Sequence, residues 1–191
     1  MLILVNKKYE NERNFVKGQE RLSQAQRGKN KKLVARLHER IKNRRKDCNH
    51  KVSREIVQSY KEIYVTNDNL RGQSKIFGKS ISDAGISQLR NFISYKSGNH
   101  SRIFKLVDSK NTTKTCGGCG SLTGPIGLHM LHVRVWECSA CGAQLDRDIN
   151  SANVILKLGL GYSLVNLKLV GGSNWVSITE LKKKAKLGTS I

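Results

Sequence analysis

The chain has 191 residues, enough for one ordinary domain and a small additional module. Lysine and arginine total 35 against 14 aspartate and glutamate residues, which gives a formal net charge of +21. Such an excess favours a polyanionic partner, because cationic proteins release condensed counterions when they bind phosphates. No stretch is apolar enough for a transmembrane helix, and residues 1–5 are too short for a signal-peptide core, so we expect no membrane partner. The five cysteines are typical of a reducing compartment, and we expect a cytoplasmic protein.

The first third of the chain is predicted to be mainly helical. Residues 2–5 indicate a short strand and residues 6–8 a polar turn. One long helical region is expected from about residue 15 to residue 60, with a break near residues 27–30. The apolar face of its second half is formed by Leu33, Leu37, Ile41, Cys48, Val52 and Ile56. Cys48 is the one cysteine outside the paired motifs described below, and we interpret it as a buried small apolar residue.

A basic surface is expected on the second half of this helical region. Its cationic residues are Arg36, Arg40, Lys42, Arg44, Arg45, Lys46, Lys51 and Arg54. Only Glu39, Asp47 and Glu55 oppose them. A charge run is commonly just a solvated surface, but here one sign dominates. We therefore expect contacts with the phosphate backbone of DNA or RNA.

The middle of the chain is predicted to alternate between strands and helices. Residues 63–66 indicate a short strand that ends in turn residues at 67–69, and residues 71–80 are expected to be a loop. A helix is predicted from residues 82–84 onward, and a second strand is predicted at residues 103–107. The apolar face of that helix would consist of Ile86, Leu89, Phe92 and Ile93. This order of elements favours an α/β layer.

Two C-x₂-C pairs in the second half of the chain indicate a metal site. They read CGGC and CSAC and are separated by eighteen residues. Thiols spaced in this way match the tetrahedral zinc-ribbon pattern, in which each pair presents two sulfur atoms from one tight turn. The predicted zinc ligands are Cys116, Cys119, Cys138 and Cys141. The alternatives are two disulfides or four unrelated buried thiols, and the regular spacing argues against both.

Two aspartates follow the second cysteine pair, at the start of a predicted short helix. In the run LDRDIN, Asp146 is placed to be the N-cap, and Asp148 lies in the first turn, where the helix dipole favours negative charge. The other interpretation is that one of them is a metal-binding carboxylate of a nuclease site. The local sequence leaves both interpretations open.

Five motifs in a fixed order carry a family resemblance. They are HERIKNRRKD (residues 38–47), HKVSREIV (50–57), KSISDAG (79–85), TKTCGGCG (113–120) and CGAQLDRDINSAN (141–153). Together they resemble the C-terminal half of the TnpB/OrfB proteins of insertion sequences, over about residues 4–158. That family is similar to compact RNA-guided DNA endonucleases with a RuvC-like, RNase H-type fold into which a zinc ribbon is inserted.

The resemblance also implies which residues belong to a nuclease site. In such a site three acids from separate elements hold two Mg²⁺ ions. The first acid is expected on a strand before the segment that begins at Leu4, so the chain is expected to be truncated before it. Thr66 occupies the position of the second acid, a glutamate, and Asp68 is a poor substitute for it. The third acid corresponds to Asp148, with Asp146 as the alternative.

We therefore expect a partial RNase H-like (RuvC-type) α/β layer with a long basic helical hairpin and an inserted Cys₄ zinc ribbon. The expected division is residues 1–109 for the partial RuvC-like region with the hairpin and residues 110–145 for the ribbon. Residues 146–158 would form the final RuvC-like helix, and residues 159–191 a tail to which we assign no role.

The expected function is that of a transposon-associated fragment of the TnpB/OrfB type that binds DNA and RNA, contains structural Zn²⁺ and does not cleave DNA by itself. Mg²⁺ is expected only if a complete nuclease site forms, with a second chain supplying the missing elements. One alternative is a nuclease-dead regulator that binds RNA or DNA. The other is a zinc-ribbon structural protein of a ribonucleoprotein, against which the DRDIN run argues, because a purely structural ribbon has no need of it.

Overall fold

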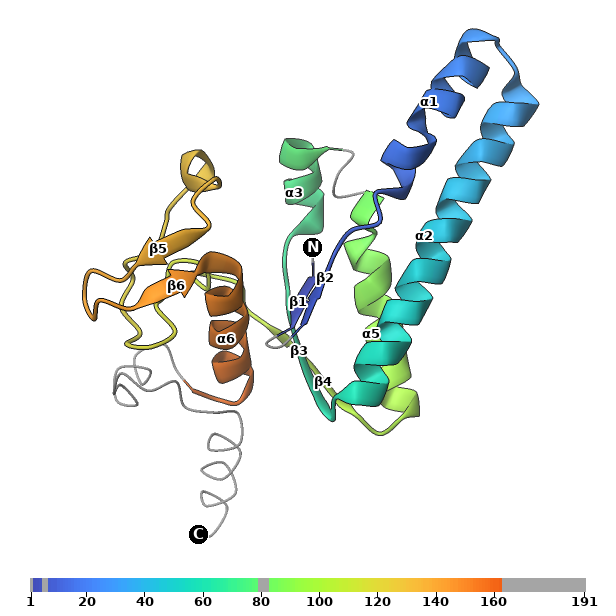
Figure 1. Ribbon diagram of the computed structural model, residues 1–191. Helices are drawn as coiled ribbons and strands as arrows, with labels where there is room; N and C mark the ends of the chain where they lie inside the picture. The colour runs from blue at the N-terminus through green and yellow to red at the C-terminus, as the bar shows by residue number, and fades with distance from the viewer. Residues whose placement is uncertain (1, 5–6, 79–82, 163–191) are drawn as a thin grey trace. The chain divides into compact units, whose positions relative to one another are not determined.

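Helices α1 and α2 form the long hairpin predicted from the sequence (Figure 1). The structure is a computed structural model that describes residues 2–4, 7–78 and 83–162. Helix α1 covers Asn14–Arg27 and helix α2 covers Lys31–Ser59, so the chain breaks where it was expected to break. The Asn30 side chain caps α2 by accepting a hydrogen bond from the Leu33 N–H at 3.0 Å. The two helices are joined by a buried apolar cluster of Leu22, Ala25 and Leu37, with Phe15, Leu33 and Val34 packed against it.

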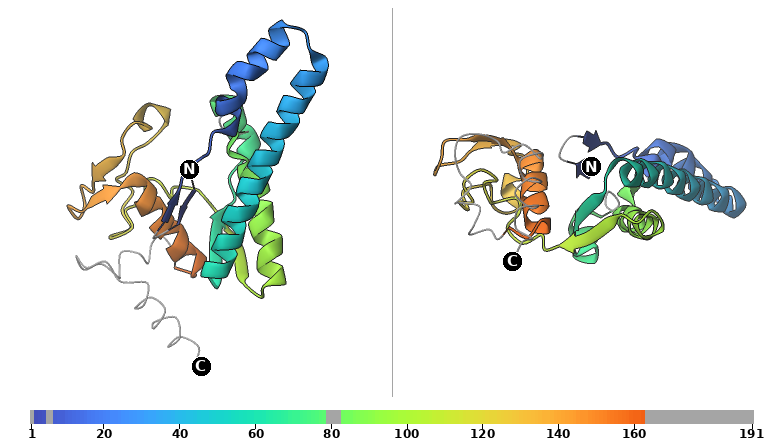
Figure 2. Two further views of the ribbon diagram at one scale, coloured as in Figure 1. Left: turned by 45° about the vertical axis from the view of Figure 1, so that its right-hand side comes forward. Right: turned by 90° about the horizontal axis from the view of Figure 1, so that it is seen from below.

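Helix α5 (Ile86–Asn99) packs along the second half of α2, as Figures 1 and 2 show from different sides. Residues that are almost fully buried on these two helices are Ile56, Val57, Leu89 and Ile93. Polar residues also lie in the contact, since the Asn49 amide donates to the Gly85 carbonyl at 3.2 Å and to Gln88 Oε1 at 3.1 Å. The predicted apolar stripe of α2 is thus only part of its buried face. Cys48 is half-buried rather than buried, a correction to the sequence-based interpretation.

The described strands form three separate two-stranded sheets. Strand β1 (Leu2–Leu4) pairs with β2 (Lys7–Tyr9), and β3 (Glu62–Thr66) pairs with β4 (Ile103–Val107). Strand β5 (Val135–Glu137) pairs antiparallel with β6 (Gln144–Asp146). The strands predicted at residues 2–5, 63–66 and 103–107 are therefore confirmed within the described residues. The fold is a mixed helix and strand fold, and the RNase H-like layer stays a prediction.

Three predicted segments differ from the structure. Residues 71–80 were expected to be a loop, but helix α3 covers Leu70–Phe77. The cause is Asn69, whose side chain accepts from the Gly72 N–H at 3.0 Å and acts as a helix N-cap rather than as a turn residue. Lys7 and Lys8 belong to β2 instead of a polar turn. The helix expected from residues 82–84 onward is interrupted at Gly85: residues 83 and 84 are helical, and α5 begins at Ile86, while residue 82 lies outside the described residues.

The chain divides into two compact units. We call residues 8–105 the helical unit and residues 106–162 the ribbon unit. The ribbon unit contains β5, β6, a short 3₁₀-helix at Leu128–Met130 and helix α6 (Arg147–Gly159). Its core is the buried cluster of Cys116, Trp136, Cys138 and Leu145. Within the described residues, no helix is both long and apolar enough to cross a membrane.

Candidate metal centre and nucleic-acid interface

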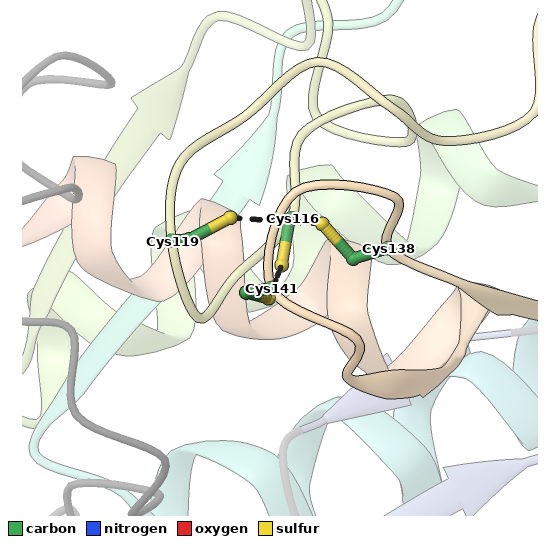
Figure 3. A group of neighbouring side chains, drawn as sticks. All are labelled: Cys116, Cys119, Cys138 and Cys141. Carbon is green, nitrogen blue, oxygen red and sulfur yellow. Dashed lines mark hydrogen bonds between the residues drawn. The ribbon is translucent and has the colours of Figure 1, made fainter.

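Four cysteine side chains converge in the ribbon unit, and their sulfur atoms all lie within 4.8 Å of one another (Figure 3). The sulfur atoms of Cys116 and Cys141 are 3.8 Å apart, and those of Cys119 and Cys138 are 3.6 Å apart. These distances are far too long for a disulfide, whose sulfur atoms are about 2.05 Å apart. Four sulfur atoms placed about 2.3 Å from a tetrahedral metal ion would be separated by about 3.8 Å. The cluster predicted from the spacing is therefore present, and its donor set fits a metal ion.

The two cysteine pairs lie in turns of the same geometry. The Gly120 N–H donates to the Cys116 carbonyl at 2.9 Å, and the Gly142 N–H donates to the Cys138 carbonyl at 2.8 Å. Both glycines have positive φ, 75° and 69° respectively. Because only glycine adopts this conformation without strain, each turn can fold its backbone around the sulfur atoms, as the sequence indicated.

The four thiols differ in their electrostatic environment. Burial raises the pKa of Cys116 to about 12. Burial also opposes ionisation of Cys138, but hydrogen bonds to its sulfur atom outweigh this effect and lower its pKa to about 6. These bonds come from the Thr123 hydroxyl at 3.1 Å and from backbone N–H groups. Before a metal ion binds, these shifts favour the thiolate form at Cys138 and the protonated thiol at Cys116.

Helix α6 holds the first cysteine turn through buried polar contacts. The Asn150 Oδ1 atom accepts from the Gly117 N–H at 2.7 Å, and its Nδ2 atom donates to the Thr115 carbonyl at 2.7 Å. About two turns further along α6, the Lys157 ammonium donates to the Gly117 carbonyl. Burial lowers the pKa of Lys157, and the nearby Cys116 thiol group counteracts this shift. The turn that carries two of the four sulfur atoms is therefore fixed on the same helix that carries Asp148.

The two aspartates at the start of α6 have different contacts. Asp146 is the N-cap, because its Oδ1 atom accepts from the N–H groups of Asp148 and Ile149, both at 2.9 Å. This confirms the capping interpretation from the sequence. Asp148 lies in the first turn, and its Oδ2 atom is 3.3 Å from the Arg134 guanidinium. The Asp148 side chain is 25% exposed, so one carboxylate remains accessible beside a cation.

Thr66 and Asp68, the other two candidate nuclease positions, lie together in the helical unit. Thr66 is the last residue of β3, and its hydroxyl donates to Asp68 Oδ2 at 2.6 Å. Both side chains are half-buried. The two candidate positions are therefore in direct contact.

Seven of the eight predicted basic residues of α2 are exposed, and these seven divide into two groups. Five of them recur along one side of the helix and are all exposed: Arg36, Arg40, Arg44, Lys51 and Arg54. At about 100° per residue they fall within about 80° of the helix circumference, and they extend over about 27 Å. We call these five residues the α2 stripe. Lys42 and Lys46 are exposed on a different side of the helix.

Two of the predicted basic residues have local structural contacts. Lys51 pairs with Asp47 at 2.8 Å, one turn away on the same helix. Arg45 is half-buried, and a Cβ atom on Gly85 would lie 2.9 Å from its Cδ atom. Arg45 therefore packs in the contact between α2 and the start of α5 and differs from the exposed residues of the stripe.

Comparison with known proteins places most of the chain in one family. Residues 5–76 match a family model described as the OrfB probable transposase of IS605-type elements. Residues 87–155 match a second model, described as the Cas12f1-like TNB domain. The chain is a TnpB/OrfB-type protein.

This TnpB/OrfB-type chain is similar to longer relatives. It is 38% identical over 143 residues to a putative RNA-guided DNA endonuclease of Streptomyces pristinaespiralis, covering 73% of the chain and 34% of the relative. It is 28% identical over 165 residues to the TnpB-like protein L79 of Acanthamoeba polyphaga mimivirus, covering 81% of the chain and 30% of that relative. The chain thus spans about a third of the length of these relatives.

A solved structure resembles the fold of this TnpB/OrfB-type chain. The protein chain is from a complex of Cas12f1 with a single guide RNA and target DNA. The TM-score is 0.58 at 19% sequence identity, over 74% of this chain and 41% of the Cas12f1 chain. At this identity the similarity shows the fold alone.

Sequence reasoning missed the residues that support the metal cluster. Asn150 stands in the DRDIN run, but its partners are backbone groups 33 and 35 residues earlier. Thr123, which donates to the Cys138 sulfur atom, lies in the loop between the cysteine pairs. Asn150 is 1% exposed, and the residues beside it in the sequence give no signal of these partners.

Proposed function

We propose that this TnpB/OrfB-type chain binds RNA and DNA through phosphate contacts of the α2 stripe, holds a structural zinc ion in the ribbon unit, and does not cleave DNA by itself. The observation that carries the proposal is the stripe itself. Five exposed cations lie in one row, with Asp47 as the acid between them, on a chain of net charge +21. A row about 27 Å long can follow successive phosphates of a nucleic-acid backbone.

Zinc is the metal that the ribbon unit fits best. Four cysteine sulfur atoms are the donor set of structural zinc sites, and all four positions of a tetrahedral ion would be filled by protein. Such a site has no open position for a substrate or for water. Zinc would therefore stabilise the ribbon and helix α6, and it would have no part in bond cleavage.

The proposed division of the chain follows the sequence-based expectation. Residues 1–109 would be a partial RuvC-like region of RNase H type with the basic hairpin, and residues 110–145 the zinc ribbon. Residues 146–158 would be the final RuvC-like helix. The tail was expected at 159–191 and receives no role, and its residues 163–191 lie outside the described residues.

The proposed lack of cleavage rests on the candidate nuclease positions. The family resemblance implies three carboxylates around two Mg²⁺ ions, which supply charge stabilisation and an activated water when bound. Thr66 offers an uncharged hydroxyl in place of a glutamate, and that hydroxyl donates to Asp68. Asp148 has a guanidinium beside it, which already neutralises part of its charge. These side chains would hold Mg²⁺ weakly unless a second chain supplies further carboxylates.

The presence of Thr66 in place of a glutamate also favours a second candidate function. A protein that has kept nucleic-acid binding and lost its glutamate at Thr66 would act as a nuclease-dead regulator of the RNA or DNA it binds. The two candidates share the α2 stripe and differ in whether a partner restores cleavage.

Charge reversal with a matched control tests the proposal. Arg36→Glu, Arg40→Glu and Arg44→Glu together should weaken binding to fluorescently labelled RNA and DNA of any sequence by at least about tenfold. Arg45 is left unchanged because it packs against α5. The control reverses three exposed lysines elsewhere, at Lys61, Lys105 and Lys110, and changes the net charge by the same amount. Equal losses in both variants would show that the stripe is ordinary charged surface.

A further inference from the structure

Three rings from α2 and α5 form a series that runs from the helix contact to the surface. The His50 and Phe92 rings are stacked, with centroids 3.9 Å apart and an interplanar angle of 21°. Phe92 and Tyr95 meet edge to face, with centroids 5.9 Å apart and an angle of 81°. We call these three residues the aromatic ladder.

The outer end of the aromatic ladder is not part of the core. Tyr95 is 47% exposed, whereas the residues that seal the contact between α2 and α5 are at most 8% exposed: Ile56, Val57, Leu89 and Ile93. Among the described residues the Tyr95 hydroxyl has no hydrogen bond, so the ring is not held there by a polar partner. Its position is instead set by Phe92, which is itself half-buried and stacked on His50. The ladder thus presents one supported ring to solvent.

Positive charge lies around the aromatic ladder. The Lys96 ammonium is fixed by donating to the His50 carbonyl at 2.8 Å and to Ser53 Oγ at 2.7 Å, and it lies 5.8 Å from the Phe92 centroid. Burial, followed by the charges of Lys96 and Lys46, lowers the pKa of His50. Burial and the charge of Arg54 lower the pKa of Lys96 in the same way. Three cations therefore act on this small area from both helices.

Negative charge nearby is already compensated. Asp47 is the acid whose charge acts on His50, and its carboxylate pairs with Lys51 at 2.8 Å. The area therefore combines an exposed ring with an excess of positive charge. A ligand that suits it has a flat aromatic face and an anionic group within a few ångströms of that face.

We propose that the aromatic ladder and the cations Lys46, Arg54 and Lys96 form a binding site for an unpaired nucleotide of single-stranded RNA or DNA. The base stacks on Tyr95, and the adjoining phosphates contact the cations. An unpaired base is required because both faces of a base in a duplex are covered by its neighbours. This inference rests on the proposed nucleic-acid binding and names the form of nucleic acid that this part of the surface selects.

The test compares one probe that offers unpaired bases with two probes of the same length that do not. The probes are a labelled 12-nucleotide oligothymidylate, the same strand with abasic sites, and a 12-base-pair duplex. Tyr95→Ala should weaken binding of the oligothymidylate by about 5- to 150-fold, the range of one lost stacking contact. Binding of the abasic strand and of the duplex should not change. Tyr95→Phe, which keeps the ring, should bind like the wild type.

Salt dependence separates stacking from charge. For Tyr95→Ala the slope of log affinity against log salt concentration should equal that of the wild type, because no phosphate contact is lost. Arg54→Gln should lower that slope and weaken all three probes.

The inference is overturned if Tyr95→Ala leaves the oligothymidylate affinity unchanged, or if it weakens the abasic strand and the duplex equally. In either case a normal effect of the α2-stripe variant would leave the proposed function intact. If the wild-type chain binds none of the probes, both the proposed function and this inference are wrong.

Discussion

Asn150 holds Gly117 from a position 33 residues away in the sequence, with its Oδ1 atom 2.7 Å from the Gly117 nitrogen. Its Nδ2 atom donates to the Thr115 carbonyl at the same distance, so one side chain satisfies two backbone groups on either side of Cys116. Asn150 is 1% exposed, and neither backbone group can form a hydrogen bond with water instead. The first cysteine turn and helix α6 are therefore one structural piece, and metal binding at the turn should be coupled to the stability of the helix.

Asn150→Ala should weaken zinc binding by about 10- to 100-fold, the usual cost of losing a group that orients a metal ligand. It should also lower the free energy of unfolding by about 2–4 kcal/mol, because a buried N–H and a buried carbonyl lose their partners. Zinc affinity is measured by competition with a chromophoric chelator. The control is Asn153→Ala on the same helix, since the described residues give the Asn153 side chain no hydrogen bond. Equal zinc affinity in the two variants would contradict the coupling.

Gly117→Ala tests the same contact from the opposite side. A Cβ atom on Gly117 would lie 2.8 Å from Asn150 Oδ1, so the two residues would have to separate. We expect a loss of about 1–3 kcal/mol in the free energy of unfolding of the zinc-loaded chain. The neighbouring Gly118→Ala is the matched control, because its Cβ atom would only make ordinary contact with the Cys116 sulfur atom, at 3.7 Å. Denaturant unfolding of both variants gives the comparison, and a similar stability of the two would be inconsistent with the structure.

Zinc binding should release protons, and zinc affinity should rise with pH. The raised pKa values of Cys116 and Cys141 mean that these thiols are protonated at pH 7 before the metal binds. Because its pKa is lowered to about 6, Cys138 should contribute few of these protons. Calorimetric titrations in buffers of different ionisation enthalpy measure the protons released. The chain should bind one zinc ion, and Cys138→Ser should abolish this binding. An affinity that is constant from pH 6 to pH 8 would count against a site built from these thiols.

Alanine substitutions at Gly85 and Gly98, at opposite ends of α5, should change the stability of the helical unit in opposite directions. Gly85 has φ of 61°, and a Cβ atom there would lie 2.9 Å from both Arg45 Cδ and Asn49 Nδ2. Gly85→Ala should therefore destabilise the helical unit by about 1–3 kcal/mol. Gly98 lies within the same helix, and a Cβ atom there would point into open space, with no neighbouring atom within 4 Å. Gly98→Ala should therefore stabilise the helical unit by about 0.5–1 kcal/mol. Thermal unfolding distinguishes the two, and destabilisation by Gly98→Ala would show that α5 is packed differently.

Structural features that depend on neighbouring residues could be predicted from the sequence. The two cysteine turns and the break between α1 and α2 each depend on residues within a few positions of one another, and both were predicted. The Asp146 cap was one of the two interpretations that the local sequence left open. Helix α3 was missed because Asn69 can begin either a turn or a helix, and local sequence does not decide between them.

The contacts that were missed join residues that are far apart in the sequence. Nothing adjacent to Asn150 indicates that its partners are Thr115 and Gly117. Arg45 looked like its basic neighbours on α2, and only the close approach of Gly85 shows that it packs in a helix contact. Asn49 and Ser53 are polar residues in the buried face of α2, which an apolar periodicity cannot detect.

We expect this TnpB/OrfB-type chain to bind nucleic acid without cleaving it by itself. The most direct measurement is one reaction in which end-labelled single-stranded and duplex DNA is incubated with purified zinc-loaded chain and Mg²⁺ or Mn²⁺. One portion is then resolved on a native gel and one on a denaturing gel. We expect a shifted band on the native gel and intact DNA on the denaturing gel, because Thr66, Asp68 and Asp148 do not provide the carboxylates that two metal ions need. Cleavage products that appear with the wild type and disappear with Asp148→Ala would contradict this account, as would a complete absence of binding.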